Sequence, residues 1–241
     1  MTDKMFADTK TWNPFTGCIH ECPYCWFKLR VLPRVSKTDK YRNGMVPTVH
    51  NDLVRKGPPN CKQSKIFVVD CGDAFCKGFY TDDIIRLLDS CHNSKLVKNF
   101  MLLTKNPGRY LEVLAKRPDI AKDRRFIWGA TIETTNGRHG HFHTQLAPYA
   151  PEPWYRADAM MALRQTYPDL RIFLSLEPVM EMDVGSMLTW IQKIKPEFIY
   201  AGYDGYNYVS KQVELSLLKF DTLVLNARML TTVHIKKVRQ P

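Results

Sequence analysis

Short apolar runs alternate with amphipathic stretches along most of this chain. Ile66–Val69 is a continuous apolar run, which is typical of a strand buried on both faces of a parallel sheet. Thr81–Cys91 then has the apolar spacing of a helix and a threonine at its start. The same alternation predicts further strands at Phe100–Leu103, Phe126–Ile132, Arg171–Leu176 and Phe198–Tyr203, and further helices at Gly108–Lys116, Tyr155–Tyr167 and Val184–Ile194.

This alternation predicts an α/β fold, because such strands pair in parallel through right-handed crossovers. A strand at Lys10–Trp12 brings the total to about six βα units, which makes a partial (β/α)6 barrel with its helices outside. Beyond residue 210 we expect only a helix at Val213–Leu218 and a strand at Thr222–Leu225. With 241 residues and no internal repeat, we expect one domain over 1–241, with a basic insertion at about 33–64 and a C-terminal extension at about 210–241.

Three cysteines in CxxxCxxC spacing follow the first predicted strand, in the run Gly17-Cys18-Ile19-His20-Glu21-Cys22-Pro23-Tyr24-Cys25. A loop this short can bring its thiolates to one soft metal centre. Iron–sulfur clusters are held by cysteine thiolates, normally four of them. Three ligands on a four-iron cluster leave one iron open, and an open iron is a place for chemistry.

Other interpretations of this cysteine loop remain open. A structural zinc site needs four Cys or His ligands, and His20 could complete such a set. The chain would then be a nucleic-acid-binding module with a structural zinc. A cluster-bearing redox or sensor protein is a further alternative. A disulfide framework is disfavoured, because seven cysteines is an odd number and nothing in the sequence indicates secretion.

Polar or ionisable residues follow each predicted strand directly. Because βα loops converge at the C-terminal ends of parallel strands, these residues should share one polar cavity with the cysteine loop. The strand ends are Asp70–Asp73, Thr104–Asn106, Thr131–Thr134, Ser175–Pro178 and Gly202–Asp204.

The cysteine loop resembles the signature of the radical S-adenosylmethionine (SAM) enzymes, in which an aromatic residue, here Tyr24, precedes the last cysteine. The resemblance implies a barrel of the radical SAM type and a 4Fe–4S cluster on Cys18, Cys22 and Cys25, whose open iron chelates SAM. Reductive cleavage of SAM then gives a 5′-deoxyadenosyl radical that abstracts hydrogen from a substrate. A one-electron reductant of the ferredoxin or flavodoxin type is implied as a partner.

More narrowly, the chain resembles the phage and archaeal Gp37/Gp68-like radical SAM group from about Trp12 to Asp204. The cysteine loop alone is also similar to that of spore photoproduct lyase, which repairs a thymine lesion in DNA. These resemblances imply chemistry but no substrate. The phrases that carry the first of them are Trp12–Cys18, Leu102–Pro107, Gly129–Thr134 and Ser175–Pro178.

The radical SAM resemblance also implies roles at the end of the second predicted strand. Gly72 and Asp73 stand where the family often has a Gly-Gly-Glu-like motif that holds the methionine amino group of SAM. The sequence here keeps one glycine and one acid, which preserves a backbone role more easily than a side-chain role. Cys71 is a candidate hydrogen-atom donor to a product radical, although a free cysteine is also commonly buried and inert.

Further SAM-binding roles fall on the next three strand ends. Thr131 and Glu133 stand where family members contact the ribose or carboxylate of SAM. Lys105 could pair with that carboxylate as a point charge. Ser175 and Glu177 are candidates for the ribose or for the substrate. For each of these residues alone, a strand cap is an equally good interpretation.

The net charge of +11 favours an anionic partner, such as nucleic acid. Ten basic residues lie between positions 28 and 65, and only Asp39 and Asp52 oppose them, so this segment carries +8 of that charge. A solvated basic surface would look the same. No apolar run approaches the ~18 residues of a membrane span, and Met1–Lys10 is too polar for a signal peptide. We therefore expect no membrane partner and a cytoplasmic location.

Two further features each allow two interpretations. His139, His141 and His143 alternate along the chain, so an extended strand would place them on one side as metal ligands, whereas a loop would expose them. Arg156 opens a predicted helix and could bind a carboxylate or phosphate in the cavity, or lie at the surface.

Overall fold

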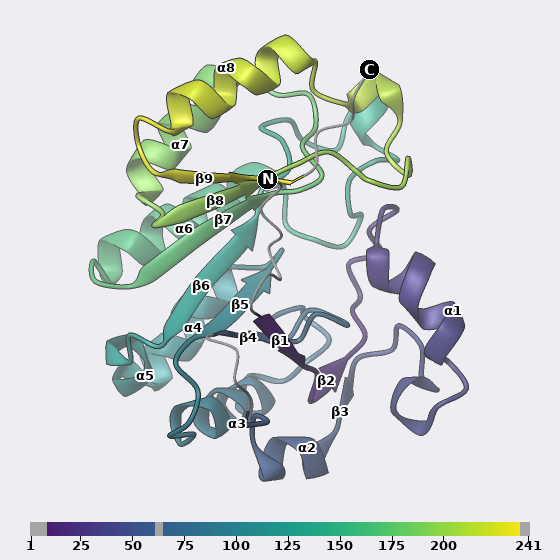
Figure 1. Ribbon diagram of the computed structural model, residues 1–241, viewed down its shortest axis with the longest axis vertical. Coiled ribbons are helices and arrows are strands. Elements are labelled where there is room, and N and C mark those ends of the chain that lie inside the picture. The colour runs from purple at the N-terminus through teal and green to yellow at the C-terminus, as the bar shows by residue number, and fades with distance from the viewer. Residues whose placement is uncertain (1–8, 61–64, 237–241) are drawn as a thin grey trace.

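The computed structural model describes residues 9–60 and 65–236 and contains one large sheet of seven parallel strands. The sheet curls into a half-barrel, with its helices around the outside (Figure 1). This confirms the predicted α/β partial barrel. The strands stand in the order β1 (Thr9–Trp12), β4 (Lys65–Val68), β5 (Phe100–Thr104), β6 (Phe126–Thr131), β7 (Arg171–Leu176), β8 (Phe198–Ala201) and β9 (Thr232–Ile235).

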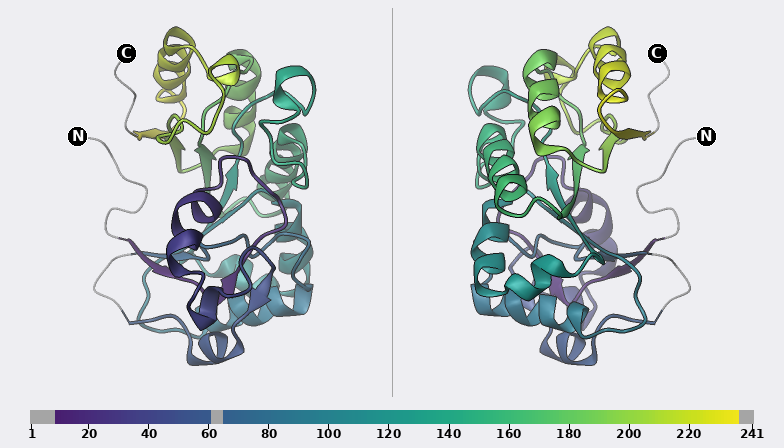
Figure 2. Two further views of the ribbon diagram at one scale, coloured as in Figure 1. Left: turned by 90° about the vertical axis from the view of Figure 1, so that its right-hand side faces the viewer. Right: turned by 90° about the vertical axis from the view of Figure 1, so that its left-hand side faces the viewer.

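A series of helices lies against the outer face of the sheet, and each contacts the next helix in this series (Figure 2). Outward-facing strand residues such as Trp128, Leu174 and Ile199 are buried in one large apolar core beneath the helices. In the described residues no helix is both long and apolar enough to cross a bilayer. The series comprises α3 (Thr81–His92), α4 (Gly108–Lys116), α6 (Pro153–Thr166), α7 (Val184–Ile194) and α8 (Leu217–Ala227), and the short helix α5 (Pro118–Lys122) follows α4.

The inner face of the half-barrel is apolar near its floor. Phe67, Met101, Ile127, Phe173 and Tyr200 form a second buried cluster, because alternate residues of a strand point to opposite faces of the sheet. Two residues further along, Leu103 on β5 is still apolar and Gly129 on β6 has no side chain, whereas Ser175 on β7 is polar. Buried polar side chains become frequent only where the strands end, as at Thr131 and Glu133. The sequence alternation therefore builds an apolar floor below a polar rim at the strand C-termini.

The predicted basic insertion folds back beside the cysteine loop. Its strand β3 (Thr48–Val49) pairs antiparallel with β2 (Phe15–Thr16), which precedes the cysteines. The main-chain N–H of Cys18 also donates to the carbonyl of Met45 at 2.9 Å. Short helical turns fill the rest of the insertion, whose residues 61–64 lie outside the described residues. The turns of the insertion are α1 (Leu32–Val35), η2 (Asp39–Tyr41) and α2 (Asn51–Lys56), and a π-helix, η1 (Phe27–Val31), joins the cysteine loop to them.

The C-terminal prediction was wrong in detail. The expected strand Thr222–Leu225 lies inside helix α8, and the expected helix Val213–Leu218 is a 3₁₀ turn, η4 (Lys211–Val213), followed by a break. Ser216 caps α8 by accepting the Lys219 N–H, and every third or fourth residue after it is buried in the core. A short aliphatic run fits a strand or a helix equally well, and the spacing of the buried residues here is that of a helix. The single-domain prediction stays a prediction.

Candidate active site

The cysteine loop is docked onto the end of strand β4 through two glycines. Gly17 has a φ of 84° and donates its N–H to the carbonyl of Cys71 at 3.0 Å. A Cβ on Gly17 would lie 2.3 Å from the Val46 carbonyl oxygen, and a Cβ on Gly72 would lie 2.4 Å from the Gly17 oxygen. Only glycine allows both the positive φ and this close approach. Gly72 therefore joins the β4 end to the cysteine loop through its main chain.

The three cysteines of the loop carry free, half-buried thiols. The His20 N–H donates to the sulfur of Cys18 and the Lys28 N–H to the sulfur of Cys25, each at 3.4 Å. The thiolate is the form that binds metal. The His20 N–H favours the thiolate of Cys18, but a hydrogen bond with the Cys76 thiol and burial outweigh it and raise the pKa of Cys18. Burial raises the pKa of Cys22 to about 12, and the nearby Lys105 opposes this rise.

The cysteine loop offers three thiols as metal ligands. Within the described ranges no three His, Cys, Asp or Glu side chains lie close enough together to hold one metal ion. The cysteines of a four-iron cluster each bind a different iron and do not need to meet at one point. The donor set of three thiols therefore fits a 4Fe–4S cluster.

Asp73 ties the cysteine loop to the neighbouring strand ends. Its carboxylate lies 3.0 Å from His20 Nε2 and accepts the Lys105 N–H at 2.9 Å and the Thr104 hydroxyl at 2.8 Å. Burial alone would raise the pKa of Asp73, but these hydrogen bonds outweigh burial and lower it. The other nitrogen of the His20 ring lies 3.4 Å from the Tyr149 carbonyl oxygen. Both ring nitrogens of His20 therefore face protein partners.

Glu133 is fully buried at the end of β6 between two cations. One carboxylate oxygen accepts the Tyr24 hydroxyl at 2.5 Å and the Lys105 ammonium at 3.1 Å. The other accepts the Arg156 guanidinium at 2.5 Å. Burial acts to raise the pKa of Glu133, but Arg156, Lys105 and Tyr24 lower it to about 2. Glu133 is therefore an ionised anchor for Lys105 and Arg156.

Arg156 lies in the first turn of α6 and is completely buried, which excludes the interpretation that it lies at the surface. It donates to the carbonyls of Pro151 and Thr131, each at 2.8 Å, in addition to Glu133. Its remaining nitrogen, Nη2, is buried without a hydrogen-bond partner. Two cations, Lys105 and Arg156, surround the single carboxylate of Glu133. This buried cluster therefore has an excess positive charge and a free donor.

The other predicted site residues fall into two separate places. Thr131 on β6 pairs with Ser175 on β7 in the sheet. Glu133 and Glu177 each follow two residues later, so they stand after the ends of neighbouring strands. Burial raises the pKa of Glu177, against the opposing effects of Lys236 and Ser175. Cys71 is buried on the side of the basic insertion.

Cys71 and the end of β4 are held by residues that local sequence patterns did not reveal. The Tyr41 hydroxyl lies 3.7 Å from the Cys71 sulfur, and burial raises the pKa of that thiol to about 12. The Asn13 side-chain oxygen accepts the N–H groups of Asp70 and Cys71 at 2.8 and 3.1 Å. These bonds hold the turn after Val69, a non-glycine residue with a φ of 63°. The Asn13-Pro14 pair that ends the first strand was the one local feature of the sequence that pointed to a special role for Asn13.

The three histidines after β6 do not lie on an extended strand. A 3₁₀ turn, η3 (Gly140–Phe142), interrupts them, and His139, His141 and His143 are all exposed. The extended geometry that would place them on one side is therefore not formed.

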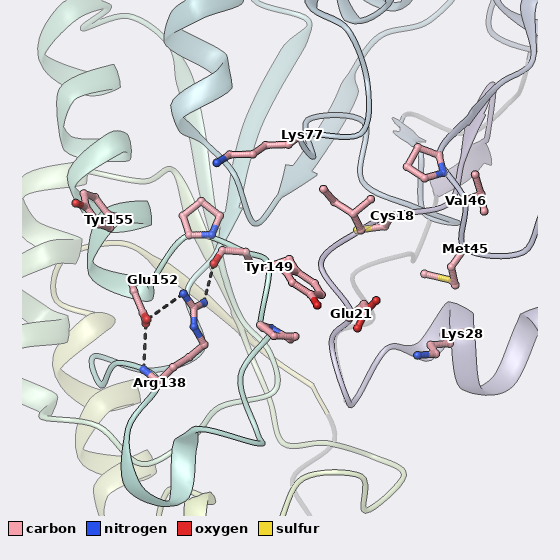
Figure 3. Close-up of a pocket in the computed structure, with 15 residues that line it drawn as sticks. Cys18, Glu21, Lys28, Met45, Val46, Lys77, Arg138, Tyr149, Glu152 and Tyr155 are labelled. Atoms are coloured by element: carbon pink, nitrogen blue, oxygen red, sulfur yellow. Dashed lines mark hydrogen bonds and ion pairs between the residues drawn. The ribbon is translucent and has the colours of Figure 1, made fainter.

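A pocket of about 970 Å³ opens between the cysteine loop and the segment that follows β6. Figure 3 shows Cys18 on one side of this pocket, Glu152 and Tyr155 on the other, and Tyr149 between them. Arg138 also lines the pocket, on the side formed by the segment after β6. Its guanidinium binds Glu152 and two carbonyls of that segment.

The Tyr24 hydroxyl links the cysteine loop to Glu133 and should be worth a measurable amount of stability. Replacing Tyr24 with phenylalanine removes a hydrogen bond to a buried carboxylate, so the free energy of unfolding should fall by about 1–3 kcal/mol. Urea unfolding of the purified chain measures this. Tyr155→Phe is the matched control, because Tyr155 is 57 % exposed. Equal stability of the two variants would contradict the link.

Comparison with known proteins places the fold and the family. No curated protein matches the chain. Among solved structures it is similar to SuiB from Streptococcus suis, solved bound to precursor peptide SuiA, with a TM-score of 0.54 and 13% sequence identity. That match covers 98% of this chain and 49% of SuiB, so the chain spans about half the length of SuiB, and at this identity the likeness shows the fold alone. A family model described as "Protein of unknown function (DUF5131)" matches residues 3–194, most of the chain, and the chain therefore belongs to the DUF5131 family.

Proposed function

We propose that this chain is a radical SAM enzyme that cleaves SAM reductively at a 4Fe–4S cluster. One observation carries the proposal. Three free thiols stand on one loop at the C-terminal end of a parallel half-barrel, next to a buried cluster with excess positive charge. Active sites of parallel α/β barrels gather at this end. The structural likeness to SuiB supports the fold that such an enzyme needs.

Cys18, Cys22 and Cys25 would hold the cluster. A reduced cluster held there would supply one electron to SAM, whose S–C5′ bond would then break to give methionine and a 5′-deoxyadenosyl radical. Lys105 and the free Nη2 of Arg156 would bind the SAM carboxylate, since both are buried cations beside Cys22. Glu133 positions these two cations, because its own carboxylate is already engaged.

The remaining predicted residues surround that site. Asp73 would act by holding the cysteine loop, and Gly72 by presenting main chain beside it. Thr131, Ser175 and Glu177 remain our proposed contacts to the ribose or the substrate. Cys71 remains a candidate hydrogen-atom donor, since a thiol with a pKa of about 12 keeps its hydrogen at neutral pH. A one-electron reductant of the ferredoxin or flavodoxin type would be the partner.

The zinc alternative makes a different demand on the same loop. A Cys₃His site needs one nitrogen of His20, which would have to leave either Asp73 or the Tyr149 carbonyl. A zinc site on this loop would also not explain why Lys105 and Arg156 share a single buried carboxylate. A zinc protein would purify colourless, with one zinc per chain.

Anaerobic reconstitution with iron and sulfide, followed by dithionite and SAM, tests the proposal. We expect a brown protein that forms 5′-deoxyadenosine, detected by mass spectrometry, and none when dithionite is omitted. A well-loaded cluster without 5′-deoxyadenosine would support the redox or sensor alternative instead. A colourless protein that binds zinc and takes up no iron would exclude the enzyme.

A further inference from the structure

The exposed aromatic side chains of this protein gather at one end of the sheet. Each of them, among the residues that the structure describes, lies in a connection that leaves the C-terminal end of a strand or in the first turn of the next helix. An exposed aromatic ring is unfavourable in water, and a group of them marks a binding surface. They are Trp26, Tyr80, Tyr149, Trp154, Tyr155 and Tyr206.

Two of these aromatic residues, Tyr149 and Tyr155, line the pocket of about 970 Å³ beside Cys18. Tyr149 and Tyr155 are 60 % and 57 % exposed. The Tyr149 main chain faces His20 through both its N–H and its carbonyl oxygen, at 3.5 and 3.4 Å. The aromatic wall is therefore fixed to the cysteine loop, and a ligand in the pocket would lie next to that loop. The volume is within the usual range for ligand sites.

The charged residues of the pocket leave two cations available. Lys28 and Lys77 line it, are exposed, and form no ion pair in the described part of the chain. Arg138 is already bound to Glu152 within its own segment. Glu21 is the remaining acid of the pocket. Beyond Lys28, the exposed Arg30 and the rest of the basic insertion continue the positive surface away from the pocket.

We infer that this pocket binds a stretch of single-stranded nucleic acid, with bases stacked on Tyr149 and Tyr155 and phosphates at Lys28 and Lys77. The inference rests on the proposed function, for which the bound strand would be the substrate. Aromatic faces between cations suit unpaired nucleotides, because every base presents a π-face and every linkage a negative charge. An acidic protein would use the lysines but not the rings. In a duplex the bases stay stacked on one another, so no base face is available to the tyrosine rings.

Fluorescence anisotropy with labelled oligonucleotides tests this inference. The anaerobically reconstituted chain is titrated, without SAM or reductant, into a mixed-sequence single strand of about 12 nucleotides and into the matching duplex. We expect the single strand to bind more tightly. Tyr149→Ala or Tyr155→Ala should each weaken this binding by roughly fivefold to a hundredfold, whereas Tyr149→Phe keeps the ring and should bind like the parent chain. Lys77→Ala should reduce the slope of log Kd against log salt by about 0.7.

Two matched controls remove similar groups from the outer surface. Lys193 on α7 and Leu225 on α8 are both exposed, and their alanine variants should bind like the parent chain. Equal binding of single strand and duplex, with no effect of either tyrosine, would show only general attraction to phosphate and would overturn the inference. Tighter binding of a labelled polyglutamate peptide of equal length would overturn it in favour of an acidic protein or peptide.

Nucleic-acid binding and SAM cleavage are measured by separate readouts, so a failure of one can be told from a failure of the other. Anisotropy reports binding, whereas SAM cleavage is read from 5′-deoxyadenosine in the same preparation without oligonucleotide. Loss of nucleic-acid binding alone would leave the SAM chemistry standing with another substrate class. Absence of 5′-deoxyadenosine in a strand-binding protein would instead indicate a binding protein with a structural metal centre.

Discussion

Replacing Cys22 with alanine should leave the chain unable to assemble an iron–sulfur cluster. The loop has three thiol ligands and no spare one within it, so two cysteines cannot hold a cluster with an open iron. After anaerobic reconstitution we expect the iron and sulfide content and the 5′-deoxyadenosine yield to fall to the level of a blank without protein. Iron and sulfide analysis, the visible absorbance and mass spectrometry measure these three quantities.

Cys91→Ala is the matched control for Cys22→Ala. It also removes one thiol, but Cys91 is completely buried in α3, where burial raises its pKa well above the usual value. This variant should load a full cluster and cleave SAM at the parental rate. Circular dichroism of both variants confirms that each is folded. A brown, SAM-cleaving Cys22→Ala protein would refute the ligand assignment.

The repeating βα pattern was readable from the sequence because its signals are local. Helices α4 and α7 and strand β7 begin and end where their apolar periods predicted. Each strand of this kind is buried on both faces, so its sequence is a nearly continuous apolar run. The C-terminal end was harder, because the Thr222–Leu225 run packs only one face of helix α8 against the core. A run of four residues cannot distinguish that helix from a strand.

The candidate site was readable only in part, for a different reason. Cysteine spacing is a local feature, and the position of a residue after a strand is also local. The partner of a buried charge is not. Tyr24 and Glu133 are 109 residues apart, and His20 and Asp73 are 53 apart, yet each pair is joined by a side-chain contact. Sequence alone could not tell a carboxylate that binds a ligand from one that anchors two cations.

Glu133→Gln should destabilise the fold by about 3–5 kcal/mol. The substitution keeps the size of the side chain but removes the charge that compensates Lys105 and Arg156, and these cations then stay buried without a counter-charge. Urea unfolding at neutral pH measures the loss. Glu112→Gln is the matched control, since Glu112 also pairs with an arginine, Arg109, but its own side chain is 45 % exposed. That variant should lose at most about 1 kcal/mol.

The same network predicts how stability depends on pH. The pKa of Glu133 is near 4.5 when unfolded and about 2 in the folded chain, so the folded state favours the ionised form. Its contribution is fully present above pH ~4.5 and is lost as pH falls through ~2, on the order of 3 kcal/mol in all. About 2 kcal/mol of this should disappear between roughly pH 6 and pH 3.

Other carboxylates, Asp73 among them, titrate in the same range, so the informative quantity is the difference in unfolding free energy between the parent chain and Glu133→Gln. That difference should shrink by about 2 kcal/mol over this interval, because glutamine does not titrate. A difference that stays constant would mean that Glu133 is not the ionised centre of this network, and the positive charge proposed to bind the SAM carboxylate would then have lost its anchor.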